Sequence, residues 1–103
     1  MINKQMKELI EKRKALHPQD DEGAKHYWEL ELEVLSVSLD YTIDYLNTAP
    51  EEEIYWCSEV WTELSKHWQS KELIDAMEGC QKRFPKIAND LQLDIECAKS
   101  ELR

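Results

Sequence analysis

Large hydrophobic residues concentrate in one stretch of the chain, residues 27–46, with the sequence YWELELEVLSVSLDYTIDYL. Its apolar and polar positions alternate, with one shift of phase, which is typical of a half-buried strand. At helical spacing the same residues form two adjacent apolar stripes, and no Gly or Pro interrupts them. The stretch is also much longer than a typical strand of about five or six residues. We therefore interpret residues 27–46 as one central helix, with a strand as the alternative.

The two stripes predict that other elements pack on this helix from two sides. Its remaining positions are mostly acidic and are expected to face water. The first stripe is Trp28, Leu32, Leu35, Leu39, Ile43 and Leu46, the second is Tyr27, Leu30, Val34, Val37 and Tyr41, and the polar remainder is Glu29, Glu33, Ser36, Asp40 and Asp44.

The flanking sequence predicts further amphipathic helices. One covers about residues 2–16 and ends before Pro18. The polar loop HPQDDEG, residues 17–23, follows it, and Asp20 or Asp21 in this loop can cap the next helix. Another helix covers about residues 51–68, for which Thr48 and Glu51 are predicted to form a capping box.

Two more helices complete the chain. Ser70 is a cap signal for a helix over residues 71–83, and Pro85 prevents that helix from continuing. The last helix is expected to start at Asn89 or Asp90, with residues 86–88 as a single turn. Short connections favour antiparallel neighbours, so the sequence predicts an all-α fold, a single domain over residues 1–103 built as an up-and-down array of about five helices.

Charge and cysteine content narrow the possible partners and compartment. The chain has 22 acidic and 13 basic residues, a net charge of −9. This balance opposes binding to nucleic acid or an anionic membrane and suits a basic protein partner, although acidity can also serve solubility alone. Cys57, Cys80 and Cys97 are odd in number and widely spaced, which favours reduced thiols in a cytoplasmic protein. The N-terminal segment is charged and lacks the apolar stretch of a signal peptide. No apolar run is long enough to span a membrane. We expect a monomer or weak dimer.

No local motif in the sequence indicates catalysis or metal binding. The histidines His17, His26 and His67 are far apart and fit no known ligand spacing. A cation could gather the acids and histidines of the 17–26 region, but the loop lacks regularly spaced oxygens, so a solvated capping loop is the favoured interpretation. We expect no enzyme activity, no metal and no cofactor.

Aromatic residues bordered by acids form the candidate binding surface. Aromatic rings supply contact area at low entropic cost, and carboxylates steer a basic partner toward them. The alternative is that these rings only cover the rim of the core. The predicted partner-binding residues are Asp40, Tyr41, Asp44, Tyr45, Glu51, Glu52, Glu53, Tyr55 and Trp56, and the 17–23 loop is a second candidate.

About half of the chain resembles a known class of proteins. The run TAPEEEIYWCSEVWTELSKHWQSKELIDAMEGCQKRFP, with the preceding SLDYTIDYLN, resembles the helical immunity proteins of bacterial toxin systems. These include the immunity proteins paired with contact-dependent growth inhibition toxins. The resemblance covers residues 39–85 and assigns no individual residue a role.

The resemblance implies a toxin inhibitor. Such a protein stays in the cytoplasm of the producing cell and binds its cognate toxin domain, covering the active site or substrate path. Many of these toxins are nucleases with basic substrate channels, for which an acidic surface competes with the phosphates of the substrate. The alternative function is a small acidic helical adaptor or regulatory protein that binds a host protein or self-associates.

Overall fold

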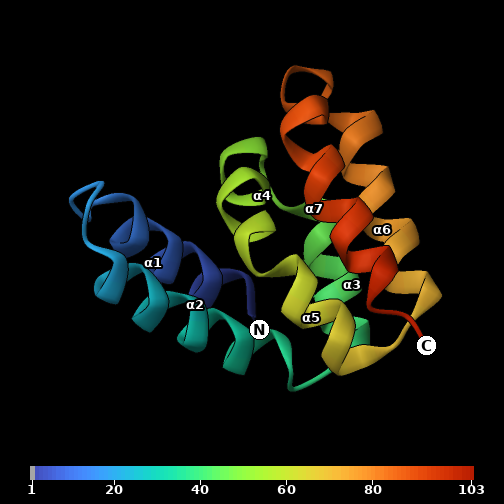
Figure 1. Ribbon diagram of the computed structural model, residues 1–103, viewed down its shortest axis with the longest axis horizontal. Coiled ribbons are helices and arrows are strands. Elements are labelled where there is room, and N and C mark those ends of the chain that lie inside the picture. Colours follow the sequence, from blue (N-terminus) through green and yellow to red (C-terminus); the bar gives the residue numbers. More distant parts are fainter. Residues whose placement is uncertain (1) are drawn as a thin grey trace.

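Helices account for most of residues 2–103, the part of the chain that the computed structural model describes (Figure 1). These residues contain no strand, so the predicted all-α fold is confirmed and the strand interpretation of residues 27–46 is wrong. The helices are α1 (Ile2–Lys14), α2 (Asp21–Leu35), α3 (Leu39–Thr48), α4 (Glu51–Cys57), α5 (Trp61–Trp68), α6 (Lys71–Arg83) and α7 (Ala88–Ser100), with the short 3₁₀ turns η1 (Ser58–Val60) and η2 (Pro85–Ile87).

The predicted central helix is two helices. α2 ends at Leu35 and α3 begins at Leu39, so the single helix over residues 27–46 is a wrong prediction. Side chains satisfy the backbone at the break: the Ser38 hydroxyl accepts from the Tyr41 amide (3.3 Å), and the Thr42 hydroxyl donates to the Leu35 carbonyl (2.8 Å). Trp68 Nε1 donates to the same carbonyl at 2.9 Å. Serine and threonine offer the backbone such alternatives to helical hydrogen bonds, and here they end one helix and start the next.

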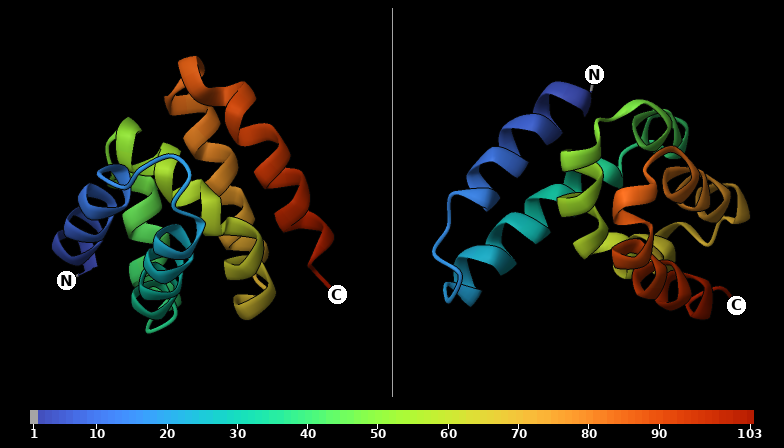
Figure 2. Two further views of the ribbon diagram at one scale, coloured as in Figure 1. Left: turned by 60° about the vertical axis from the view of Figure 1, so that its left-hand side comes forward. Right: turned by 90° about the horizontal axis from the view of Figure 1, so that it is seen from above.

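The break divides the fold into a hairpin and a larger group of helices. α1 and α2 lie side by side as an antiparallel pair, and the views in Figures 1 and 2 show this pair projecting from one side of the molecule. α7 packs on α5 and α6, and α6 also packs on α3. Fully buried Trp61 and Tyr45 lie in the core, which also takes in Met6 and Ile10 of α1 and Leu35 of α2. The apolar faces of both helix groups therefore share one hydrophobic core.

The predicted helix over residues 51–68 is also divided. Its capping box does not form: Pro50 occupies the N-cap position of α4, and the Thr48 hydroxyl donates to the Asp44 carbonyl (2.7 Å). Seven residues later the chain tightens into η1, where the Ser58 hydroxyl donates to the Tyr55 carbonyl at 2.6 Å. A serine that bonds back to a carbonyl one turn earlier favours such a local bend. η1 therefore separates α4 from α5, with Ser58 and Val60 buried.

Several helices begin or end where the sequence predicts. Asp20 caps α2 by accepting from the Gly23 amide (2.8 Å), and Ser70 caps α6 by accepting from the Leu73 amide (3.2 Å). α6 ends at Arg83, and the single turn after Phe84 is the 3₁₀ turn η2. α7 begins at Ala88, one residue before the earlier of its two predicted starts.

The three cysteines are free thiols in the described structure, as predicted. Cys57 and Cys80 are buried, and burial raises the pKa of both thiols, although Arg83 partly opposes this at Cys80. Both therefore act as packing residues at neutral pH. None of the helices in residues 2–103 combines the length and apolar character needed to cross a bilayer.

Candidate functional site

Tyr45 is not a surface residue. Its side chain is fully buried, and its hydroxyl donates to Glu53 Oε1 at 2.9 Å, joining α3 to α4. Its ring is enclosed by the core and is not available to a partner. The prediction of Tyr45 as a binding residue is therefore corrected, because its position on α3 faces inward with Thr42 and Leu46.

The remaining predicted residues lie on more than one surface. Tyr41 is 51% exposed and lines a hollow with Ile2 and Val37, whereas Tyr55 and Trp56 line a different hollow beside α7. The other members are acids: Asp40, Asp44 and Glu52 are exposed, Glu51 and Glu53 are half-buried, and the Glu52 carboxylate pairs with Lys14 of α1. The structure thus separates the aromatic residues that the sequence grouped together.

The hollow that contains Tyr55 and Trp56 combines these two aromatic rings with the acids Glu59, Asp90 and Asp94. We call it the acidic cleft, and it measures about 230 Å³. α4 and η1 form one wall and α7 forms the other. The two aromatic rings meet edge to face, with centroids 5.5 Å apart. The acidic cleft is lined by Tyr55, Trp56, Ser58, Glu59, Asp90 and Asp94.

Glu59 is already neutralised within the molecule. Its Oε1 and Oε2 accept from Arg13 Nε (3.0 Å) and Nη2 (2.8 Å), and its Oε1 also accepts from Trp28 Nε1 (3.0 Å). The same Arg13 guanidinium lies over the Trp56 ring, 5.0 Å from its centroid. These contacts fix the α4–η1 wall of the cleft. They also show an arginine binding against one of its rings.

The opposite wall carries two acids without a cationic partner. Asp90 and Asp94 lie one turn apart on α7, and the structure pairs neither with a basic side chain among residues 2–103. Burial raises the pKa of Asp94; the neighbouring Ser58 hydroxyl opposes this, and the charge of Glu59 adds to it. Like charges one helical turn apart cost about 0.2–0.5 kcal/mol. An ammonium or guanidinium entering the cleft would relieve that repulsion.

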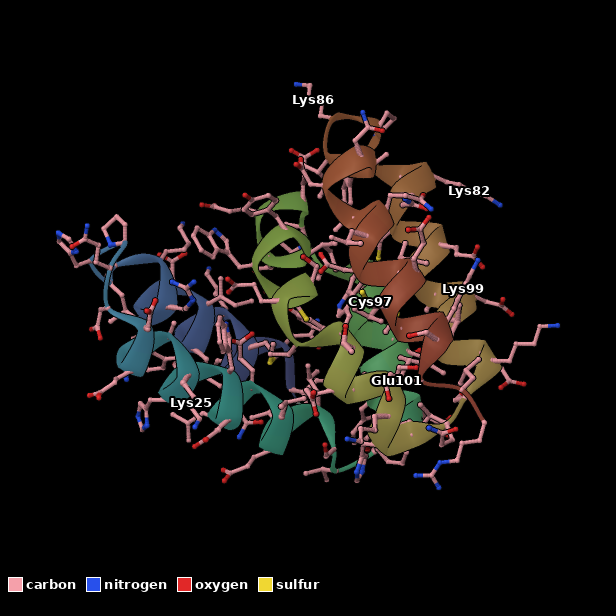
Figure 3. The ribbon with its side chains drawn as sticks, viewed as in Figure 1. Lys25, Lys82, Lys86, Cys97, Lys99 and Glu101 are labelled. Atoms are coloured by element: carbon pink, nitrogen blue, oxygen red, sulfur yellow. The ribbon has the colours of Figure 1, made fainter. Side chains whose placement is uncertain are left out.

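The nearby lysines are directed elsewhere. Lys99 of α7 pairs with Glu78 of α6 at 3.0 Å. The side chains of Lys82 and Lys86 extend outward from the far end of α6 and from η2, away from the body of the molecule (Figure 3). The charge of Asp90 and Asp94 therefore remains available to an external cation.

Another acid, which is not among the predicted binding residues, lies inside the protein and does not line the acidic cleft. Glu31 of α2 is fully buried, and neither carboxylate oxygen has a hydrogen-bond partner in the structure. Burial raises its pKa to about 8; the charge of Glu59 adds to the increase and that of Arg13 reduces it. The carboxyl group is therefore mostly protonated at neutral pH. It affects stability and has no access to a partner.

For some of these residues, the sequence itself indicates on which face of a helix they lie. Glu31 comes three residues after Trp28 and four before Leu35, so helical spacing already places it on the apolar stripe. The spacing of Asp90 and Asp94 likewise shows that they share a face of α7. No local pattern shows that this face meets Tyr55 and Trp56, about thirty-five residues earlier in the chain.

Side chains of the 17–23 loop accept hydrogen bonds from the backbone of the loop and of the start of α2. His17 Nδ1 accepts from the Gln19 amide at 3.1 Å, and Asp20 is the cap of α2. In the described part of the chain no three His, Cys, Asp or Glu side chains converge to hold a metal ion.

Comparison of the chain with protein-family models, with curated proteins and with solved structures finds no match in any of the three.

Proposed function

We propose that the protein is an immunity protein that binds and neutralises a cognate bacterial toxin domain through the acidic cleft. The observation that supports this most is the pair Asp90 and Asp94, which have no cationic partner in the described chain and lie opposite Tyr55 and Trp56. Aromatic rings beside free carboxylates are suited to a lysine or arginine of a basic partner.

The geometry supports a specific mode of binding. A basic side chain of the toxin enters between α4 and α7, pairs with Asp94 and packs on the ring of Trp56. Arg13 already binds Trp56 and Glu59 in a similar way within the molecule. If the toxin is a nuclease, the residue captured here belongs to the basic channel that normally holds substrate phosphates. Occupying that channel excludes the substrate.

The proposal is tested by binding to the toxin-like C-terminal domain encoded in an adjacent large gene. Asp90→Asn/Asp94→Asn is the test variant. Asp40→Asn/Asp44→Asn is a matched control, because it removes two acids at the same spacing from α3 and belongs to the predicted surface. Association rates measured at low and moderate salt report the electrostatic contribution.

Asp90→Asn/Asp94→Asn is expected to associate more slowly, with a weaker salt dependence, and to lose the ability to rescue the growth of cells that express the toxin domain. Asp40→Asn/Asp44→Asn is expected to stay close to wild type. Equal loss in both variants would show that only total charge matters, which contradicts the cleft assignment. Capture of a host protein in place of any toxin domain would favour the adaptor function.

A further inference from the structure

The outer face of the α1–α2 hairpin carries an apolar groove that the proposed function does not use. Two adjoining hollows form it, and they share Gln5, Glu33 and Val34. The groove continues past the end of α2 to Val37 and Tyr41, which are 76% and 51% exposed. Its apolar residues are Ile2, Leu9, Leu30, Val34, Val37 and Tyr41.

This groove contains most of the second apolar stripe of residues 27–46. The first stripe enters the core with Leu35 and Leu46, whereas Leu30 and Val34 of the second are only half-buried and Val37 is exposed. An exposed contiguous apolar surface is typical of an interaction site. The sequence predicted a packing element on this side, and within residues 2–103 the groove remains open.

The two helices that border the groove have opposite charge. α1 has five basic and two acidic side chains, in a chain whose net charge is −9. α2 has five acidic side chains and one basic side chain. Glu31 is buried, and Arg13 and Lys14 pair with acids of η1 and α4, so the exposed balance is smaller but keeps the same signs.

A surface with one basic and one acidic helix is complementary to a copy of itself. A two-fold axis parallel to the helices places α1 of each copy over α2 of the other, and the apolar floors then face each other. An axis across the helices would instead place α1 on α1, with like charges opposed. We propose that the groove is a homodimer interface in which two hairpins form a four-helix bundle.

The pairing predicts which charges meet. Gln5 near the start of α1 and Glu33 near the end of α2 line the same hollows, because the hairpin is antiparallel. Lys4 lines an adjoining hollow that shares Glu8 and Lys12 with the groove. In the proposed dimer it therefore comes near Glu33 of the other copy. Lys4→Glu and Glu33→Lys should not destabilise the helices that carry them, because an acid near a helix N-terminus and a base near a helix C-terminus are favourable.

Sedimentation velocity over a range of protein concentrations tests the proposal on the full chain. The wild type is expected to show a monomer–dimer equilibrium. Val37→Asp, in the exposed link between α2 and α3, is expected to be monomeric. Leu93→Asp is the matched control, because Leu93 is 67% exposed on α7, outside the groove, and this variant should still dimerise.

Charge reversal separates specific pairing from net charge. Lys4→Glu and Glu33→Lys should each weaken the dimer at least tenfold, and the double variant, which keeps the wild-type net charge, should restore it. Lys82→Glu changes net charge as Lys4→Glu does, but on an outward side chain of α6, and should have little effect. Circular dichroism melting confirms that each variant is folded.

A wild type that remains monomeric at every concentration would overturn the proposal. So would dimers that survive Val37→Asp, dissociation by Leu93→Asp, or a double variant no better than the single reversals. These outcomes are independent of toxin binding, because Asp90 and Asp94 do not line the groove.

Discussion

Arg13 and Glu59, 46 positions apart in the sequence, form a two-point ion pair through Nε to Oε1 (3.0 Å) and Nη2 to Oε2 (2.8 Å). The pair joins the α1–α2 hairpin to η1, and Trp28 adds a third hydrogen bond to the same carboxylate. Both side chains are largely shielded from solvent, with 16% and 27% of their surfaces exposed. This cluster is therefore a principal polar connection between the two parts of the fold.

Arg13→Ala is expected to lower the free energy of unfolding by roughly 1–3 kcal/mol, because it removes charged hydrogen bonds and the contact with Trp56. Urea denaturation measures the change. Lys99→Ala is the control: it breaks the exposed pair with Glu78, for which we expect a loss below about 1 kcal/mol. Equal effects of the two variants would show that Arg13 is an ordinary surface residue.

The buried carboxyl of Glu31 is expected to make the protein less stable as pH rises. Its pKa is raised from 4.5 to about 8 on folding, so between these values the folded state binds more protons than the unfolded state. The stabilisation is fully present below pH 4.5 and is lost progressively up to about pH 8, at no more than about 1.4 kcal/mol per pH unit.

Urea denaturation at several pH values between 4.5 and 8 checks this effect. Glu31→Gln cannot ionise and should remove the contribution, giving a flatter stability profile. Glu33→Gln, on the exposed surface of the same helix, should leave the wild-type slope unchanged. A slope that persists in the Glu31 variant would assign the pH dependence to another group.

Asp94→Asn is expected to stabilise the free protein while weakening its binding to a basic toxin domain. The substitution removes a carboxylate whose pKa burial has raised and whose charge repels Asp90, which together favours folding by a few tenths of a kcal/mol. Thermal melting and partner binding are measured on the same variant. Loss of stability together with loss of binding would indicate a structural residue.

Tyr45→Phe and Tyr55→Ala separate a core tyrosine from a cleft tyrosine. Tyr45→Phe removes the hydrogen bond to Glu53 and should cost about 0.5–1.5 kcal/mol of stability with partner binding unchanged. Tyr55→Ala should do the opposite, because that ring is exposed and lines the acidic cleft. Denaturation and binding assays on both variants distinguish the two roles. Loss of binding in Tyr45→Phe at unchanged stability would contradict the assignment.

The sequence predicted the features of this fold that depend on neighbouring residues. The caps at Asp20 and Ser70 and the end of α6 before Pro85 involve residues within a few positions of one another. The break after Leu35 is not apparent from periodicity. Two of the side chains that stabilise it, Ser38 and Thr42, are local, and only Trp68, 33 residues away, is distant. Helical periodicity continues across Ser36–Ser38 even though the helix does not.

The candidate site was only partly predictable for the same reason. Tyr55 and Trp56 were identified from their chemistry, but their neighbours Asp90 and Asp94 come from a helix that only the tertiary structure brings close. Tyr45 shows the opposite error. An aromatic residue at the edge of an apolar stripe can face either way, and packing between α3 and α4 decides its direction.

The two donors to the Leu35 carbonyl also constrain the order of events during synthesis. The α1–α2 hairpin needs only the first 35 residues and can collapse early, but its junction with the remaining helices requires Thr42 and then Trp68. Until Trp68 has been synthesised, the hydrogen bonds at this junction are incomplete. The apolar inner face of the hairpin therefore lacks part of its packing while residues 36–68, about a third of the chain, are synthesised.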